Sequence, residues 1–137
     1  MVQAYIWRLL GNKGDRVPFK VADASAIALG DFLELADPMT VTAHAGNVDT
    51  PIVGIAAHEK VANDGHVFIT AITNCIFKAT ILAGGSCTIG DNVSMGNAAG
   101  EVNLSSSLDD EKGWAVGKAY EDGAAGHTAL FRSLFMR

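Results

Sequence analysis

The sequence predicts an all-β protein: a small antiparallel β-barrel or sandwich with a weak internal two-fold repeat and an N-terminal arm. Three observations predict it. Apolar residues alternate with a period of two, turn signals stand between the alternating stretches, and no window beyond the first ten residues has convincing helical spacing. A chain of 137 residues has the length of one compact domain, or of two small modules that share a core, and it buries enough surface to fold without disulfides or a structural metal.

The alternating stretches follow one another from Ile27 to Leu134. Segments rich in Gly, Asn and Asp separate them, at residues 45–47, 63–65, 83–86, 96–100, 109–113 and 122–126. Such short strands at this spacing are typical of small barrels and sandwiches. We expect the core to include Leu29, Leu33, Leu35, Val53, Ile55, Ile69, Ile89, Val93, Val116 and Leu130.

A weak repeat relates the two halves of the chain. The matching pairs are residues 29–35 with 89–95 at an offset of 60, 53–56 with 116–119 at 63, and 65–66 with 126–127 at 61. In each apolar-Gly-Asp turn, glycine can adopt a positive φ and aspartate can bond the local backbone; in each Val-Gly strand, glycine permits a bulge or a close backbone approach. Chance self-alignment of a Gly- and Ala-rich β sequence is the alternative.

The start of the chain differs from the rest in charge. Residues 1–20 hold four basic residues and one aspartate, net +3, whereas the remainder holds six basic and fourteen acidic residues, net −8. We therefore divide the chain into an N-terminal arm, residues 1–25, and a β-barrel domain, residues 26–137, with half-repeats at about 26–72 and 86–135. An arm that carries aromatic residues, and whose charge is opposite to that of the rest of the chain, is typical of a partner-binding segment. The expected partner-binding residues are Tyr5, Trp7, Arg8, Lys13, Arg16 and Lys20. An ordinary first strand with a solvated basic face is the alternative.

The sequence offers no catalytic constellation. The four histidines, His44, His58, His66 and His127, lack metal-ligand spacing, and the two cysteines are expected as free thiols in a reducing cytosol. The glycine-rich segment 83–87 lacks a phosphate-binding lysine and the strand-to-helix context of a phosphate loop. We expect no catalytic residue, no metal and no cofactor.

Composition limits the partners as well. A net charge of −5 disfavours a main role in binding nucleic acid or an anionic membrane. With 21 alanines, 15 glycines and 18% charged residues, much of the surface is expected to be small and apolar, which suits a homo-oligomer covered by partners. The apolar stretches are too short for a signal-peptide core or a membrane span, so we expect a soluble, unexported protein.

One family shares these turn and strand patterns. The stretch Gly90-Asp91-Asn92-Val93, followed by residues 114–128 with Val116-Gly117-Lys118-Ala119, resembles the small β-barrel decoration, or cement, proteins of tailed-phage heads. The first half repeats a looser version at Gly30-Asp31 and residues 53–56. The resemblance implies a structural virion protein, made in the host cytoplasm, that binds the outside of the capsid and clamps neighbouring major capsid subunits as a homotrimer.

Two other functional classes stay open. A non-enzymatic ligand-binding or carrier β-barrel module would need an exposed lysine at a hairpin tip, and Lys60 and Lys118 lie near turns. A small β-barrel hydrolase would use His66 or His127. Mass after expression with a ligase and an activity screen with His→Ala controls distinguish these two classes.

Overall fold

The computed structural model describes residues 3–46, 51–96, 100–105 and 115–135. These ranges contain strands and turns and no helix. The strands are β1 (Tyr5–Leu9), β2 (Val17–Lys20), β3 (Phe32–Asp37), β4 (Thr40–Ala43), β5 (Ile52–Ala56), β6 (Phe68–Ile72), β7 (Cys75–Ile81), β8 (Asn92–Met95), β9 (Glu101–Leu104), β10 (Gly117–Ala119) and β11 (Thr128–Ser133). The turn expected at 109–113, residues 97–99 of the turn expected at 96–100, and Trp114 lie outside the described residues.

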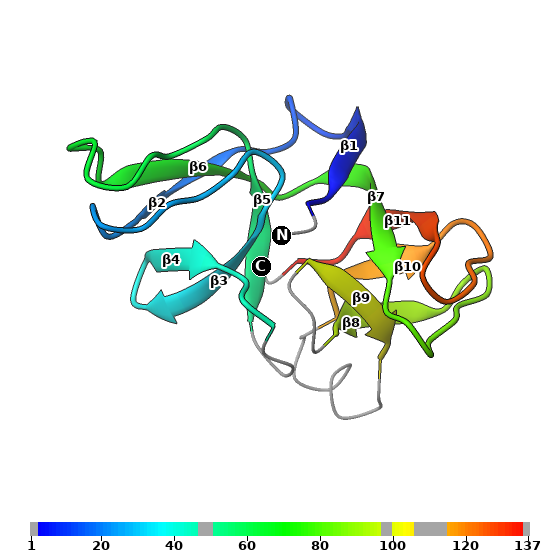
Figure 1. The fold of residues 1–137 in the computed structure, drawn as a ribbon. Coiled ribbons are helices and arrows are strands. Elements are labelled where there is room, and N and C mark those ends of the chain that lie inside the picture. The colour runs from blue at the N-terminus through cyan, green and yellow to red at the C-terminus, as the bar shows by residue number, and fades with distance from the viewer. Residues whose placement is uncertain (1–2, 47–50, 97–99, 106–114, 136–137) are drawn as a thin grey trace.

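The all-β prediction is confirmed, and each half of the chain closes a barrel of its own (Figure 1). The first barrel has the strand order β2-β4-β3-β5-β6, and β2 pairs with β6 to close it. The second ring runs β7-β9-β8-β10-β11, and β11 pairs with β7. Each ring has one parallel pair, β2–β4 or β7–β9, and its other pairs are antiparallel. The two barrels thus have the same topology, which confirms the repeat.

The apolar-Gly-Asp turns are equivalent in detail. Gly30 and Gly90 have φ of 87° and 90°, a region that glycine adopts without the penalty of a Cβ. The carboxylate of Asp31 accepts a hydrogen bond from the N–H of Ala28 at 2.9 Å, and that of Asp91 accepts one from Thr88 at 2.9 Å. Both roles assigned to these residues from sequence are confirmed.

The central glycines of the Val-Gly strands have a steric role. A Cβ built on Gly117 would lie 2.9 Å from the Cβ of Phe131, and one on Gly54 would lie 2.8 Å from the carbonyl oxygen of Ile72. The neighbouring strand therefore approaches these two backbones too closely for any side chain.

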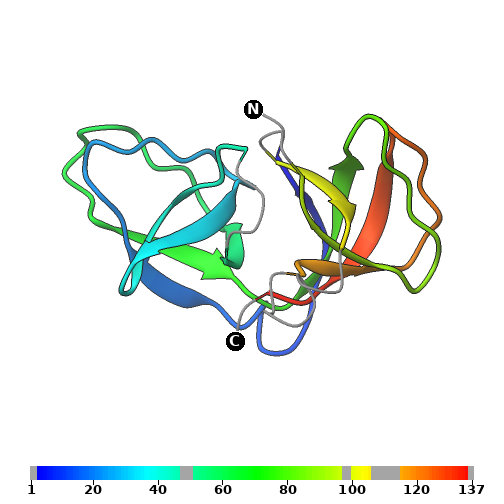
Figure 2. The ribbon, with the colours of Figure 1, turned by 90° about the horizontal axis from the view of Figure 1, so that it is seen from below.

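Apolar packing joins the barrels, which stand side by side in Figure 2. One buried cluster fills the first barrel, and a larger one fills the second barrel and extends to residues of β3, β5 and β6. Phe32 of the first barrel makes edge-to-face contacts with Phe77 and Phe135, at centroid distances of 5.6 and 6.3 Å. The N–H of Gly100 donates to Nδ1 of the buried His44 at 3.4 Å, which adds a polar contact between the two halves.

Of the ten residues expected in the core, six are buried, two are half-buried and two are exposed. Leu33, Val53, Ile55, Ile69, Val93 and Val116 are buried, whereas Leu35 and Leu130 are half-buried. The prediction was wrong for Leu29 and Ile89, which are 64% and 70% exposed. Both residues stand directly before the turn glycine. The positive φ of that glycine turns the chain, so the in–out alternation of the following strand does not extend back to them.

Candidate interaction surface

Strand β1 lies at the end of the six-stranded sheet and pairs with β7 on one side (Figure 1). Its register shifts between Ile6 and Arg8, so Trp7 occupies a bulge. Only Ile6 packs against the core, while Tyr5 is 66% and Trp7 50% exposed. The guanidinium of Arg8 lies 5.0 Å from the Trp7 ring centroid, a cation–π contact. We call the exposed face formed by Tyr5, Trp7 and Arg8 the β1 surface.

The loop after β1 is held firmly against the link between the barrels. Asp15 accepts hydrogen bonds from the Thr73 hydroxyl at 2.6 Å, through its carbonyl, and from the Asn74 side-chain amide at 2.8 Å, through its carboxylate. Lys13 and Arg16 are exposed on this loop, and Nε of Arg16 donates to the carbonyl of Lys13 at 3.2 Å. The Arg16 guanidinium is therefore held on the loop that follows β1, and Lys13 is exposed on the same loop.

Lys20 stands apart from the other five expected partner-binding residues. It is exposed on β2, where it pairs with Phe68 of β6 in the first barrel. The structure thus groups Tyr5, Trp7 and Arg8 on one strand, Lys13 and Arg16 on one loop, and Lys20 on another barrel.

An apolar groove of about 370 Å³ adjoins the β1 surface. Its walls are the start of β1, the turn before β3, and parts of β5 and β6, namely Ala4, Tyr5, Ile6, Leu29, Gly30, Ala56 and Ile72. Tyr5 belongs both to the groove and to the β1 surface. The exposed aromatic face therefore continues into a concave apolar region, which is the kind of shape that anchors a partner.

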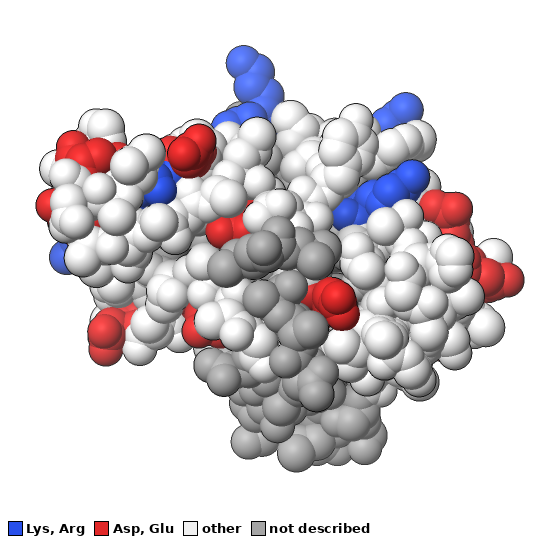
Figure 3. Space-filling model, viewed as in Figure 1, with Lys and Arg blue, Asp and Glu red and all other residues white. Residues whose placement is uncertain are grey.

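The charges of the described residues are unevenly distributed. In Figure 3 several basic side chains stand along the upper part of the face, where β1 lies in Figure 1, and acidic ones lie at the left and right ends and near the middle of the face. The β1 surface is thus a basic and aromatic region on a chain with a net charge of −5.

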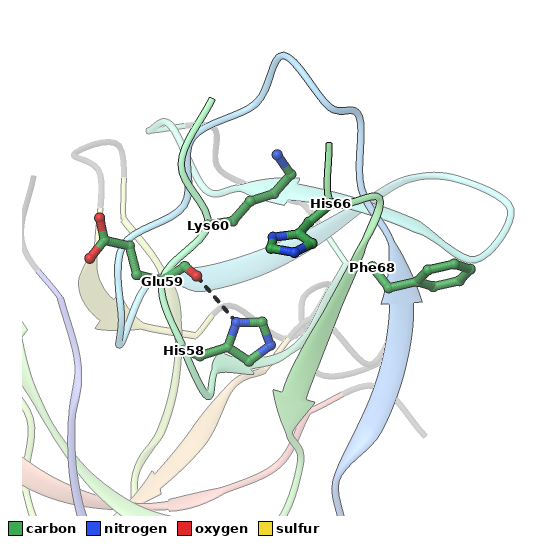
Figure 4. Close-up of a pocket in the computed structure, with 5 residues that line it drawn as sticks. All are labelled: His58, Glu59, Lys60, His66 and Phe68. Atoms are coloured by element: carbon green, nitrogen blue, oxygen red, sulfur yellow. Dashed lines mark hydrogen bonds between the residues drawn. The ribbon is translucent and has the colours of Figure 1, made fainter. Parts of the chain in front are cut away.

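A polar pocket of about 250 Å³ opens at the far end of the first barrel, lined by His58, Glu59, Lys60, His66 and Phe68 (Figure 4). Lys60 is 2% exposed, and its side chain points away from His58. Its Nζ donates to the carbonyls of Asp23 and Val61 at 2.9 and 3.1 Å and to the Asp64 carboxylate at 3.1 Å. Its three donor positions are therefore used, and Lys60 joins two loops of the barrel.

Asp64 completes this arrangement. Its carboxylate accepts the backbone N–H groups of His66 and Val61 at 2.9 and 3.2 Å. The hydrogen bond from His66, assisted by Lys60, lowers the pKa of Asp64 well below its usual value. A carboxylate held in its charged form and a lysine with no free donor position form a structural unit rather than an acid–base pair.

The histidines do not converge. His44 is buried between the barrels, whereas His58, His66 and His127 are exposed. Nδ1 of His58 lies 3.2 Å from the carbonyl of Glu59, and its Nε2 accepts the N–H of Thr70 at 3.2 Å. Among the described residues, no group of three or more His, Cys, Asp or Glu side chains could hold a metal ion.

Both cysteines are free and buried. Burial raises the pKa of the Cys75 thiol to about 12 and also raises that of Cys87. Neither is therefore a reactive thiolate at neutral pH.

The described residues include no helical segment that could span a lipid bilayer.

The fold and the surface together define a class: an all-β, double-barrel protein with an exposed aromatic and basic strand at the end of one sheet. No family model matches the sequence, and the search of curated proteins found no match. Among solved structures, the chain is similar to the N base of the head fiber of bacteriophage phi29, with 15% identity and a TM-score of 0.49 over 86% of this chain and 92% of that one.

Sequence reasoning missed three features of these surfaces. It placed Leu29 in the core, although Leu29 lines the groove. It treated Lys60 as a residue near a turn, although the residue is buried. It gave no sign of the groove, whose walls come from four separate parts of the chain. The repeated apolar-Gly-Asp pattern was the one signal that could have marked Leu29 and Ile89 as a matched pair of turn residues.

Proposed function

We propose that this chain is a non-enzymatic structural protein of a phage virion, which binds the outside of the capsid lattice and cements neighbouring major capsid subunits. The β1 surface is the observation that carries the proposal. Tyr5 and Trp7 expose large rings on a strand fixed by β7, and Arg8 adds a charge over the Trp7 ring. Exposed aromatic and arginine side chains on a rigid element are typical of protein-binding hot spots.

The sequence resemblance supports the choice of partner. The Gly-Asp turns and Val-Gly strands that resemble capsid decoration proteins are the elements that repeat in the two barrels, at Gly30, Gly54, Gly90 and Gly117. The groove beside β1 offers a concave apolar region for a side chain of the capsid subunit.

We further propose that the protein forms a homotrimer on the virion surface after synthesis in the host cytoplasm. Support comes from the number of exposed large apolar residues outside β1. They include Met39, Val61, Val67, Leu104 and Tyr120. Contacts with further copies would remove part of this area from water.

Trp7 should contribute more to attachment than any of the cations. Truncating a hot-spot tryptophan costs about 2 kcal/mol or more, whereas an exposed ion pair contributes under ~1 kcal/mol and weakens with salt. The loop cations Lys13 and Arg16 therefore add a salt-dependent share, and Lys20 contributes from the first barrel.

The experiment is recruitment to shells assembled from the major capsid protein of the same genome, measured by co-sedimentation. Trp7→Ala is expected to weaken recruitment by about thirtyfold, the equivalent of 2 kcal/mol. Phe68→Ala is the matched control, because Phe68 is also an exposed ring, at 57%, but lies on the first barrel. Substitution is preferable to deletion of residues 1–20, since that deletion would remove β2 from the first barrel. Equal recruitment of the wild type and Trp7→Ala would contradict the attachment role of β1.

A carrier function finds less support. The amine of Lys60 is buried and fully bonded, and the exposed Lys118 lies within β10, where its Nζ donates to the carbonyl of Gly90 at 3.3 Å. Neither lysine is a free amine at the tip of a hairpin, which is what a modification enzyme requires.

A further inference from the structure

The turn at Ile89–Asp91 reproduces the turn at Leu29–Asp31 bond by bond. The N–H of Gly30 donates to Ala56 at 3.1 Å, and that of Gly90 donates to Ala119 at 2.9 Å. The N–H groups of Ala56 and Ala119 donate back to the carbonyls of Asp31 and Asp91, each at 2.8 Å. Because the two turns share one geometry, what binds one of them indicates what fits the other.

In the first barrel, the chain itself covers the turn. The N–H of Ala4 donates to the carbonyl of Gly30 at 2.9 Å. A Cβ built on Gly30 would lie 2.5 Å from the Ala4 carbonyl oxygen and 3.2 Å from the Cβ of Gln3. An extended segment, residues 3–5, thus lies directly on Gly30, and Tyr5 shares a groove with Leu29.

In the second barrel, no described residue covers the equivalent turn. A Cβ built on Gly90 would meet nothing within 4 Å, and Ile89 is 70% exposed. The Gly90 carbonyl accepts a hydrogen bond from the exposed Lys118 Nζ at 3.3 Å, a contact that an incoming backbone N–H can replace. The turn is nevertheless rigid, because the Asp122 carboxylate accepts the N–H of Ile89 at 2.8 Å.

The surroundings of this turn are acidic. The described residues around it include Asp91, Glu121 and Asp122, and the ring of Tyr120 is 48% exposed. Of the nearby cations, Lys118 bonds the Gly90 carbonyl, and Arg132, its pairing partner on β11, donates to Asn74. Acidic side chains also appear at the right-hand end of Figure 3, where the loops of the second barrel lie in Figure 1. An occupant of matching charge is therefore positive.

We propose that the Ile89–Gly90 turn is a second docking site, which takes an extended, positively charged segment of a partner protein. The segment lies across Gly90 as residues 3–5 lie across Gly30, donates one backbone N–H to the Gly90 carbonyl, and packs an apolar side chain on Ile89. The inference rests on the proposed function for the identity of the partner, a second capsid subunit. A protein with docking sites at β1 and at Ile89 can join two neighbours, which is what cementing requires.

The first test uses a peptide that copies the chain's own covering segment. The probe is residues 3–9 with two lysines added, an amidated C-terminus and a fluorescent label, titrated with the purified full chain by anisotropy. We expect saturable binding that Ile89→Asp weakens at least tenfold. Leu29→Asp is the matched control at the equivalent turn and is expected to leave binding within twofold. Both residues are exposed, so both variants should keep the wild-type unfolding midpoint.

Three results would overturn the proposal. They are no saturable binding, equal binding by the wild type and Ile89→Asp, and a loss of binding in Leu29→Asp but not in Ile89→Asp. The last result would mean that the peptide exchanges with β1 on the first barrel. A peptide with glutamates in place of the added lysines should bind at least tenfold more weakly, and equal binding would remove the charge argument.

The second test separates this inference from the proposed function. Shell recruitment of Ile89→Asp is compared with that of the wild type, with Phe68→Ala as the control, because Phe68 lies on the first barrel outside both docking sites. Peptide binding without any recruitment of the wild type to shells would leave the docking site standing and contradict the capsid function. Wild-type recruitment that Ile89→Asp leaves unchanged, together with failure of the peptide to bind, would contradict the docking site alone.

Discussion

Phe32 should be the side chain that most strongly couples the two barrels, and its truncation gives a direct measure of that coupling. The ring is 1% exposed and comes from β3 of the first barrel, yet it packs edge-to-face on Phe77 and Phe135. Truncation of a buried Phe to Ala typically costs about 3–5 kcal/mol, and each edge-to-face pair contributes about 0.5–1.5 kcal/mol beyond the area that it buries. We expect Phe32→Ala to lie in the upper half of the first range, because two such pairs are lost together.

The assay is equilibrium unfolding in urea, followed by far-UV circular dichroism. Phe68→Ala is the control, since it removes the same group from a ring that is 57% exposed and should change the free energy of unfolding by under ~0.5 kcal/mol. The wild type should unfold in one transition because the larger core cluster spans both barrels. A loss below ~1 kcal/mol for Phe32→Ala would contradict the packing of Phe32 between the barrels, because a buried ring with two aromatic partners cannot be removed at so low a cost.

Three further predictions concern packing, thiol chemistry and pH. Gly117→Ala should destabilise the fold by about 1–3 kcal/mol in the same urea assay, because the new Cβ would lie 2.9 Å from a side-chain carbon of the next strand; an unchanged midpoint would contradict that close approach. Cys75 and Cys87 should react with a disulfide reagent at pH 8 only when the protein is unfolded, since both are buried and have raised pKa values; rapid reaction of the folded protein would contradict the burial. The lowered pKa of Asp64 contributes stability that is present above pH 3.8 and is lost as the pH falls toward the lower pKa of the folded state. Between pH 5 and pH 2, Asp64→Asn should therefore lose less stability than the wild type. Parallel plots of stability against pH for the two proteins would contradict the lowered pKa.

Local chemistry made the fold class and the repeat predictable. Period-two alternation identifies strands, because successive side chains of a strand point to opposite faces. The Gly-Asp turns could be predicted because positive φ at glycine and carboxylate bonding to a nearby N–H depend on residues close in sequence. The same short-range reasoning explains why Gly30 and Gly90 behave alike in the structure.

The closure of two barrels could not be read from the sequence. Closure depends on pairings between distant segments, such as Val17 with Ala71 and Thr128 with Thr80. No local pattern shows which strands pair along their edges. The parallel pair in each barrel is a long-range result of the same kind.

The surfaces were predicted in part for the same reason. The aromatic and basic character of residues 5–8 is visible in the sequence, and their exposure could be expected on an edge strand. The groove beside them depends on how Leu29 and Ile72 approach β1 from other parts of the chain. The burial of Lys60 could not be predicted from its local sequence, because its partner Asp23 lies 37 residues away on another loop.

Cryo-electron microscopy of shells incubated with the purified chain can show where the protein attaches. Added density is expected on the outer surface, with two barrels per copy and with contacts to two neighbouring major capsid subunits, one of them through the strand that carries Trp7. Trp7→Ala should reduce the occupancy of that density, while Phe68→Ala should leave it unchanged. Shells without added density at saturating protein, or density attached only by the far end of the first barrel, would contradict the account.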